Sequence, residues 1–271
     1  MTFAEAAAST AALIAAVTDE ADIEARAMVC AAAGREYREY PLYRDSVFPE
    51  KYEEKLRKYS EERLKNIPIQ YILGEWEFMG LTFRTRPCAL IPRQDTETLC
   101  EEALKLGGES ALDMCCGTGC IGISLAKIGG MKAAFSDISA ECIALARENA
   151  ELNGVKAEFF RGDLFENVRG KYSLICSNPP YIPSGDIPSL QKEVQHEPML
   201  ALDGGDDGLD IYRRIAQQYK DYLLPGGKLL LEVGMGQAQD VIAIFGGGYA
   251  VKDLCGVERV VVVSCALCSF F

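Results

Sequence analysis

Residues 111–122 read ALDMCCGTGCIG, and this stretch decides the fold class of the chain. Its apolar start predicts a buried strand, Gly117 and Gly119 predict a tight turn, and the following residues begin a helix. In such a unit the glycines let a ligand approach the backbone, and the start of the helix offers free amide groups. We therefore expect a nucleotide-type cofactor to bind at this turn.

Strand and helix patterns alternate from Gly107 to the end of the chain. The strands are expected near 110–114, 131–136, 155–160, 171–177, 227–233, 249–254 and 258–266, and the helices near 119–128, 139–152, 207–223 and 236–245. Such alternation is typical of a mostly parallel, doubly wound α/β sheet. The last two strands are too close in sequence for a parallel crossover, so they should pair antiparallel.

Residues 1–67 show helical patterns and predict a small helical bundle. In the expected helix 50–66, apolar side chains recur near a 3.6-residue spacing, at Tyr52, Leu56, Tyr59 and Leu64. An amphipathic stripe of this kind serves either to pack a domain or to bind a partner. The sequence leaves both interpretations open.

Residues 68–92 predict a linker that contains a β-hairpin. Residues 75–78 and 81–85 alternate between apolar and polar, and Met79 with Gly80 can form the turn between them. A helix from about Thr96 to Leu106 should follow, capped by Asp95 or Thr96. We expect the sheet domain to cover residues 93–271.

Composition limits the classes of protein to which this chain can belong. The chain has 271 residues, 49% of them apolar, and a formal charge of −12. This charge argues against a surface that grips nucleic acid as a whole, although a local basic groove stays open. No apolar run approaches the roughly 20 residues that a bilayer span needs.

Cysteine usage predicts a cytosolic protein without a metal site. The eleven cysteines are scattered through expected strands and helices without a secretory signal, as in proteins whose thiols stay reduced. Cys265 and Cys268 have the spacing of half a metal motif, but there is no second pair. The single histidine, His196, lies in a long polar connection over residues 182–206 and is given no role.

Acidic residues after successive strands are candidates for cofactor binding. Asp137 ends the second strand, about 20 residues after the glycine turn, and suits ribose hydroxyls. Asp113 would repel a pyrophosphate but can hold an ammonium group, which favours S-adenosylmethionine over a dinucleotide. Asp163 can accept a hydrogen bond from an adenine amino group, while Leu164 covers the ring. Turn caps for Asp113 and Asp137, and a solvated loop for Asp163, remain alternatives.

The stretch Asn178-Pro179-Pro180-Tyr181 predicts the chemistry. A planar amide or aromatic amine is a poor nucleophile, and two acceptors, the Asn178 side-chain oxygen and the Pro179 carbonyl, can orient its N–H groups. The prolines hold that carbonyl by fixing φ, and Tyr181 can stack on the flat nitrogen group. We interpret this stretch as the site of methyl transfer to a planar nitrogen.

With these residues in place, the chain resembles the PrmC/HemK family of protein-(glutamine-N5) methyltransferases. The resemblance rests on Pro68–Gly74, Pro92–Glu97, Asp113–Gly119, Asn178–Tyr181 and Leu224–Gly227. It implies a seven-stranded Rossmann-like, S-adenosylmethionine-dependent methyltransferase domain. The implied substrate is the glutamine of the Gly-Gly-Gln motif of class I peptide chain release factors, which the helical domain of residues 1–67 would help to bind.

The resemblance also implies roles for single residues. Contacts with the cofactor are expected at Cys115, Cys116, Gly117, Thr118, Gly119, Asp137, Asp163, Leu164 and Asn178. The side chain of the substrate glutamine is expected to be held by Asn178, Pro179, Pro180 and Tyr181. The chain departs from the family at two places. It has Cys115 and Cys116 where Gly-Thr is common, and Gln94 where proline is common.

Two other functions remain open from the sequence. The same tetrapeptide serves methylation of adenine or cytosine amino groups, with a flipped base stacked on Tyr181. The chain can also be an interaction protein that binds a cofactor without turnover. We expect a monomer that binds neither a membrane nor, stably, nucleic acid.

Overall fold

The computed structural model describes residues 1–264 and forms two compact units. The first unit comprises Met1–Gly74 and Gln191–His196, and the second comprises Glu75–Leu190 and the chain from Glu197 onward. The sequence predicts a division of the chain into three functional parts, residues 1–67, 68–92 and 93–271. The two compact units do not test these functional boundaries, which stay a prediction. Cys265 and Cys268 lie outside the described residues. Within residues 1–264, none of the helices has the length and apolar character that crossing a membrane requires.

The first unit is a helical bundle, as predicted. Its helices are α1 (Phe3–Ile14), α2 (Ala21–Ala32), α3 (Tyr40–Tyr43), α4 (Glu53–Arg63) and α5 (Ile69–Leu73), with 3-10 turns at Tyr37–Glu39 and Glu50–Tyr52. A capping box starts α1, in which Thr2 and Glu5 satisfy each other's backbone amides. Phe3, Ile14, Met28 and Phe48 are buried in its core. The expected helix 50–66 is shorter, because its first residues form a 3-10 turn.

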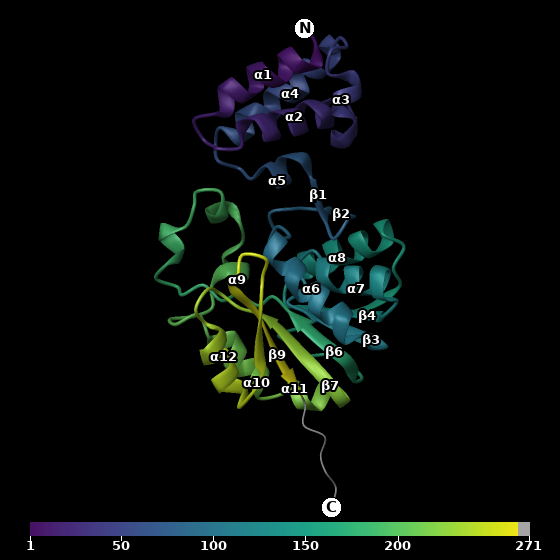
Figure 1. Ribbon diagram of the computed structural model, residues 1–271, viewed down its shortest axis with the longest axis vertical. Helices are drawn as coiled ribbons and strands as arrows, with labels where there is room; N and C mark the ends of the chain where they lie inside the picture. Colours follow the sequence, from purple (N-terminus) through teal and green to yellow (C-terminus); the bar gives the residue numbers. More distant parts are fainter. Residues whose placement is uncertain (265–271) are drawn as a thin grey trace, which may run out of the picture. The chain divides into compact units, whose positions relative to one another are not determined.

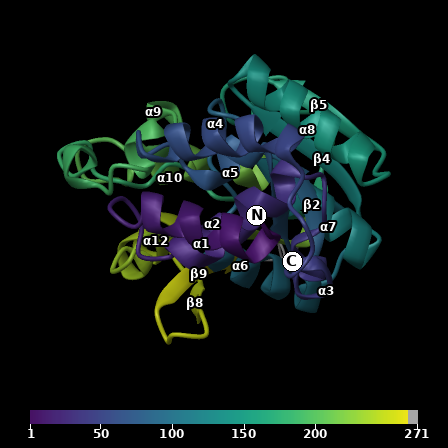
Figure 2. The ribbon, with the colours of Figure 1, turned by 90° about the horizontal axis from the view of Figure 1, so that it is seen from above.

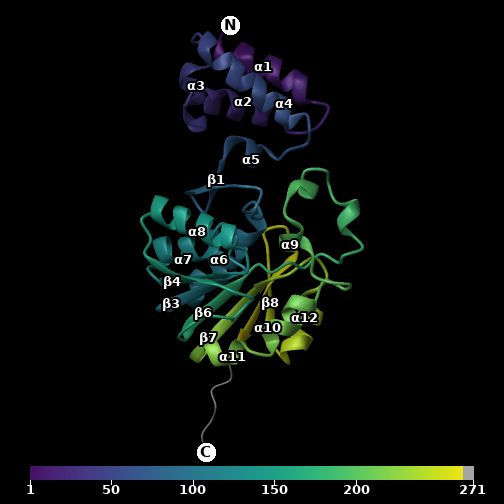
Figure 3. The ribbon, with the colours of Figure 1, turned by 180° about the vertical axis from the view of Figure 1, so that it is seen from behind.

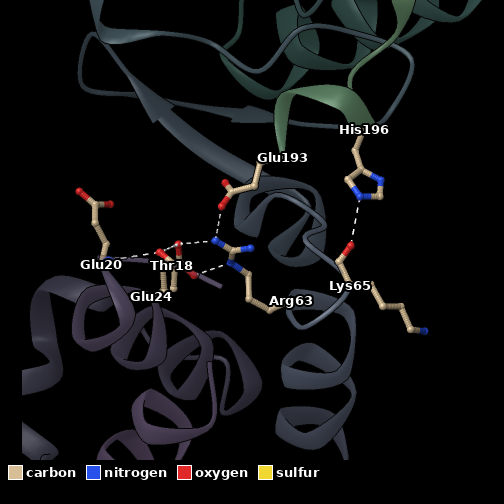
Figure 4. Close-up of polar contacts among 7 residues, drawn as sticks. All are labelled: Thr18, Glu20, Glu24, Arg63, Lys65, Glu193 and His196. Carbon is tan, nitrogen blue, oxygen red and sulfur yellow. Dashed lines mark hydrogen bonds and ion pairs between the residues drawn. The ribbon is translucent and has the colours of Figure 1, made fainter. Parts of the chain in front are cut away.

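A buried ion cluster holds the segment Gln191–His196 in the first unit (Figure 4). The guanidinium of Arg63 is fully buried and donates to both carboxylate oxygens of Glu24, at 2.6 and 3.1 Å. It also pairs with Glu193. His196 Nε2 lies 3.1 Å from the Lys65 carbonyl oxygen, which gives the segment a second polar contact. One cation between two carboxylates therefore joins α2 and α4 to Glu193, which lies 130 positions after Arg63 in the chain.

The predicted hairpin opens the second unit. Its strands β1 (Glu75–Phe78) and β2 (Leu81–Arg84) pair antiparallel. Met79 and Gly80 have φ of 51° and 72°, and two successive positive φ values give the turn the twist that two-residue hairpins favour.

The second unit is built on a seven-stranded sheet with the order β5-β4-β3-β6-β7-β9-β8. Figure 2 shows β4 and β5 on one side and β8 and β9 on the other, and Figure 3 shows β6 and β7 between β4 and β8. The strands are β3 (Ser110–Met114), β4 (Lys132–Asp137), β5 (Ala157–Arg161), β6 (Tyr172–Ser177), β7 (Leu223–Glu232), β8 (Tyr249–Lys252) and β9 (Glu258–Ser264). Among the strands within residues 1–264, only β9 runs antiparallel in this sheet, to β7 and β8. The predicted mostly parallel sheet with an antiparallel final pair is confirmed.

Helices cover both faces of this sheet (Figure 1). One apolar cluster joins the sheet to α6 (Gln94–Leu106), α7 (Cys120–Gly129) and α8 (Ala140–Leu152). Another joins it to α10 (Asp210–Ala216), α11 (Tyr219–Tyr222) and α12 (Ala238–Phe245), and α9 (Met199–Leu202) lies in the long connection. The single helix expected at 207–223 is thus two short helices.

The predicted start of α6 is wrong. The helix begins at Gln94, and its N-cap is Arg93, which makes no side-chain capping bond. Asp95 instead forms an ion pair with Arg259 at 3.0 Å. Thr96 is 2% exposed and accepts a hydrogen bond from Asn178. Tertiary partners therefore occupy both side chains that the sequence suggested as caps.

Candidate active site

The sheet order changes direction between β3 and β6, and a pocket lies beyond the carboxyl ends of these strands. From β3 the chain moves outward to β4 and β5, then returns to place β6 on the other side of β3. Ligands of open α/β sheets bind at such a switch point. Nine residues predicted for the site line this pocket: Cys115, Cys116, Gly117, Thr118, Asp137, Asp163, Leu164, Asn178 and Pro180. Gly119, Asp113, Pro179 and Tyr181 are absent from its wall.

The turn after β3 is held by the acid at the end of β4. The Gly117 amide donates to Asp137 Oδ2 at 3.0 Å, and the Ser139 amide donates to Oδ1 at 2.8 Å. Burial raises the pKa of Asp137 although these bonds favour its charged form. Each carboxylate oxygen can accept a further bond. Asp137 therefore shapes the turn and still offers acceptor capacity to a ligand.

Asp113 lies behind the turn rather than on the pocket wall. It is 1% exposed, and its Oδ2 accepts a hydrogen bond from the Gly122 amide at 2.8 Å. Its Oδ1 is buried and has no hydrogen-bond partner among the described residues. Desolvation raises the pKa of this carboxyl well above its ordinary value. Asp113 supports the start of α7, and a direct contact with a cofactor stays a prediction.

The turn after β5 adds Asp163 and Leu164 to the pocket. Leu164 is 6% exposed and has a φ of 52°, which aims its side chain from an unusual backbone conformation. Asp163 Oδ2 pairs with Arg214 of α10, and both residues line the pocket. Sequence reasoning missed Arg214, because nothing in the pattern of α10 distinguishes it from the neighbouring Arg213.

Asn178 follows β6 and belongs to a chain of polar contacts. Its Nδ2 donates to Thr96 Oγ1 at 3.3 Å. The Tyr181 hydroxyl donates to Glu232 Oε1 at 3.3 Å, and the Gln237 amide holds the Tyr181 carbonyl at 2.9 Å. Burial and Glu232 together raise the pKa of Tyr181, so that its hydroxyl keeps its proton. The stretch from Asn178 to Tyr181 is therefore anchored at both ends.

A further wall of the pocket comes from residues 88–93, which were predicted only as linker and helix start. Glu197 is 5% exposed and binds this wall through two contacts. Its Oε2 accepts from the Ile91 amide at 3.0 Å, and its Oε1 pairs with Arg93. The motif Pro92–Glu97, on which the family resemblance partly rests, was the available signal for this wall, but no sequence pattern connects it with Glu197.

The charges of the pocket fit a cationic ligand without phosphate. Two arginines line it, and each is already paired with a carboxylate: Arg93 with Glu197, and Arg214 with Asp163. Among the described lining residues, no cation is thus left for a pyrophosphate. Asp137 contributes an acceptor, and Ser136 Oγ is a buried hydroxyl without a described partner. These features fit S-adenosylmethionine better than a dinucleotide.

Comparison with known proteins gives a consistent result. Family models for the Methyltransferase small domain and the PrmC N-terminal domain match residues 94–197 and 5–74. A release factor glutamine methyltransferase of Geobacter sulfurreducens is 46% identical over 209 residues, which cover 73% of this chain and 74% of that protein. One of Bradyrhizobium diazoefficiens is 36% identical over 260 residues, which cover 90% and 88%.

Solved structures confirm the fold. A methyltransferase of Pyrococcus furiosus superposes with a TM-score of 0.56 at 19% identity, over 69% of this chain and 90% of that one. The rRNA methyltransferase RsmC of T. thermophilus, solved with AdoMet and guanosine, gives 0.52 at 18% identity, over 70% and 49%. The predicted Rossmann-like fold is thereby confirmed, and the match of residues 94–197 to the Methyltransferase small domain confirms the predicted methyltransferase domain.

Proposed function

The chain belongs to the family of release factor glutamine methyltransferases, and from this premise we propose that it methylates the glutamine of the Gly-Gly-Gln motif in class I peptide chain release factors. S-adenosylmethionine is the proposed methyl donor, and the side-chain amide nitrogen, N5, is the acceptor. The observation that carries the proposal is the position of Asn178, which lies on the wall of a pocket that also contains the glycine turn.

The bound cofactor supplies a methyl group on a sulfonium, and the chain supplies its binding site. Residues 115–119 would receive it along the backbone, with Asp137 accepting from the ribose hydroxyls. Asp163 pairs with Arg214 through Oδ2, which leaves Oδ1 to accept from the adenine amino group. Leu164 would cover the ring.

Asn178 and Pro179 orient the substrate nitrogen. Because Asn178 Nδ2 donates to Thr96, the side-chain oxygen of Asn178 is left to accept a substrate N–H. The Pro179 carbonyl accepts the second N–H, and both contacts shift electron density onto the nitrogen. Alignment and polarisation would then provide most of the rate. The new C–N bond would replace the methyl–sulfur bond of the donor, which leaves S-adenosylhomocysteine, and the amide would give its proton to water after the transfer.

The helical part would contribute to partner recognition. The match of residues 5–74 to the PrmC N-terminal domain supports a role of residues 1–67 in binding the release factor. We also propose that the protein acts in the cytoplasm as a monomer, without stable binding to nucleic acid.

A methyl-labelling experiment tests this function. The chain is incubated with S-adenosylmethionine carrying a labelled methyl group and offered a release factor, the same factor with its motif glutamine changed to asparagine, or nucleic acid. We expect label in the unchanged factor alone. Label in nucleic acid would support an amino methyltransferase instead. Absence of label, with retained cofactor binding, would support an interaction protein.

Replacement of Asn178 tests the role of the amide. We expect Asn178→Ala to lower kcat by about 100-fold or more, since one oriented acceptor of the transition state is lost. The affinity for S-adenosylhomocysteine, measured by calorimetry, should change by less than about fivefold. Equal activity of the variant would disprove the role. Gln239→Ala, which removes an exposed amide of α12 outside the pocket wall, serves as the matched control and should keep full activity.

A further inference from the structure

We propose that Asn149 of α8 is a positioning residue for cofactor binding, which holds the turn of residues 115–119 and the end of the β-hairpin in one arrangement. The inference rests on the part of the proposed function that places S-adenosylmethionine at this turn, and it does not depend on the identity of the methyl acceptor. Asn149 is absent from the pocket wall, so it acts through the backbone of Thr118, which belongs to that wall.

The side-chain amide of Asn149 is fully buried and makes three hydrogen bonds to backbone groups. Its Oδ1 accepts from the Arg84 amide at 2.7 Å, and its Nδ2 donates to the Arg84 carbonyl oxygen at 3.1 Å. Nδ2 also donates to the Thr118 carbonyl oxygen, at 2.9 Å, so both of its hydrogens are used. The amide therefore pairs with the last residue of β2 as a neighbouring strand would, and it reaches from there to the turn after β3.

The chemistry of these three partners determines the residue type at position 149. A backbone N–H only donates and a backbone carbonyl only accepts, so the side chain must offer one acceptor and two donors. A carboxamide offers this set, whereas a hydroxyl has one hydrogen to donate and a carboxylate has none. The same requirement fixes which end of the amide is the oxygen. Loss of the amide would leave buried backbone groups without partners, which is destabilising.

Asn149 and Asp137 hold neighbouring backbone groups of the turn. Asp137 Oδ2 accepts from the Gly117 amide at 3.0 Å, whereas Asn149 donates to the Thr118 carbonyl oxygen. The N-cap of α7 is Gly119, so the Thr118 carbonyl lies before the helix and is available to a side chain. A glycine-rich turn has much conformational freedom to lose when a ligand binds. Bonds that order the turn beforehand reduce this entropic cost and increase the affinity.

The chain after the hairpin runs along the same helix to the pocket. Cys142, near the start of α8, donates its thiol hydrogen to the Cys88 carbonyl oxygen at 3.0 Å. Cys88 and Ala89 then form part of the pocket wall. Asn149 thus joins two segments that both reach the pocket, residues 84–89 and the turn. A cofactor that stabilises the turn therefore also stabilises the bonds between α8 and the hairpin end, and by linkage these bonds strengthen cofactor binding.

A second asparagine of α8 separates this role from simple attachment of the hairpin. Asn153 lies one helical turn after Asn149, and its Nδ2 donates to the Thr82 carbonyl oxygen of β2 at 2.9 Å. Its other bond goes to the Asn149 carbonyl oxygen, also at 2.9 Å. Neither bond reaches the turn of residues 115–119. Asn153 therefore provides a matched control, with the same amide group and the same hairpin strand.

Calorimetry with S-adenosylhomocysteine gives the first test. Asn149→Leu has nearly the shape of the original side chain but removes its three hydrogen bonds, and Asn153→Leu removes the same group from its contact with Thr82. We expect the Kd to rise at least tenfold in Asn149→Leu and less than twofold in Asn153→Leu. An unchanged Kd in Asn149→Leu, or an equal rise in both variants, would overturn the inference.

Kinetics with a release factor distinguish positioning from a general loss of structure. In Asn149→Leu the KM for S-adenosylmethionine should rise at least tenfold, while kcat at saturating cofactor and the KM for the release factor should change less than twofold. A variant that is merely less folded would lose kcat at an unchanged KM, and this result would overturn the inference. If the unchanged protein methylates no release factor, the proposed function fails, and the calorimetry still decides the role of Asn149.

Hydrogen exchange in the unchanged protein needs no variant, and it decides the matter if Asn149→Leu does not fold. The Arg84 amide donates to Asn149, and Arg84 is absent from the pocket wall. The Met79 amide of the same hairpin donates instead to Glu97 Oε1 of α6, at 2.8 Å, and serves as the control. Saturation with S-adenosylhomocysteine should slow exchange at Arg84 at least tenfold more than at Met79. Equal slowing at both amides, or none at Arg84, would overturn the inference.

Discussion

Cys115 has a φ of 56°, in the left-handed region that favours glycine. A residue with a Cβ atom is destabilised there by about 1–2 kcal/mol. Burial and the nearby Asp137 raise the pKa of the Cys115 thiol to about 12, so the thiol stays protonated beside the pocket.

A pair of substitutions measures the backbone contribution at Cys115. Both Cys115→Gly and Cys115→Ala remove the thiol, but only glycine is relaxed at this φ. We expect the glycine variant to be more stable than the alanine variant by about 1 kcal/mol, whereas alanine is the more stable residue at ordinary positions. Urea denaturation, followed by fluorescence of the single tryptophan, Trp76, gives the two free energies of unfolding. An alanine variant of equal or greater stability would contradict the prediction.

Glu232 should also make stability depend on pH. Its carboxyl ionises near 4.5 in the unfolded chain and at about 7 in the folded one, so the folded protein binds more protons between these values. Its contribution to stability is therefore greatest below pH 4.5 and is lost as the pH rises to 7. Relative to wild type, Glu232→Gln should gain up to about 3 kcal/mol between pH 4.5 and 8. A difference between the two proteins that does not vary with pH would contradict this.

At the scale of elements, α7 packs closely on the sheet just beyond Cys120 and Ile121, the two residues of this helix that line the pocket. A Cβ atom at Gly122 would lie 2.5 Å from Phe135 Cε1 and 2.9 Å from the Asp113 Cβ. Phe135 belongs to β4 and Asp113 to β3, so α7 contacts both strands at this glycine. Gly122 follows Gly117 and Gly119 in the turn and start of α7, and this close contact gives a packing reason for a glycine at that position.

Gly122→Ala tests this packing. We expect a loss of about 2–3 kcal/mol in the free energy of unfolding, because a methyl group would overpack the contact between α7 and the strands. Gly185→Ala, where a Cβ atom would meet nothing within 4 Å, is the matched control and should change stability by less than about 0.5 kcal/mol. Urea denaturation followed by Trp76 fluorescence compares both variants. Equal stabilities would show that the helix moves away without cost.

At the scale of the molecule, the chain leaves the second unit after Leu190 and returns to it at Glu197. The intervening segment packs in the first unit on Arg63 and Lys65. Arg63 is enclosed by carboxylates from α2 and from this segment, whereas Arg57 of the same helix forms an exposed pair with Glu61 at 3.0 Å. The two arginines differ in burial, and therefore in the consequences of their removal.

Arg63→Met should destabilise the first unit by about 3–5 kcal/mol, because it leaves the Glu24 charge buried without its partner. Hydrogen exchange, which follows each unit separately, should show faster exchange in α2, α4 and Gln191–His196. Arg57→Met is the matched control and should change exchange little, since exposed pairs contribute at most about 1 kcal/mol. Similar exchange in both variants would contradict a structural role of the buried pair.

The sequence by itself determined the features that depend on local patterns. The strands and helices of the sheet domain follow from hydrophobic periodicity, and the hairpin from its alternation around Met79 and Gly80. The glycine turn and the stretch 178–181 follow from residue types with narrow backbone preferences. Asp137 was predicted as a site residue because it ends a parallel strand, and the carboxyl ends of such strands lie at the ligand-binding edge of the sheet. This placement does not depend on contacts with distant parts of the chain.

Only the tertiary structure decided which side chains meet across the chain. Thr96 has the local chemistry of a helix cap, yet it lies inside α6, where it accepts a hydrogen bond from Asn178. Glu232 and Arg63 are charged residues that a sequence pattern assigns to the surface, and both are buried by partners far away in sequence. Burial and hydrogen bonding are properties of the folded neighbourhood, so no local pattern contains them.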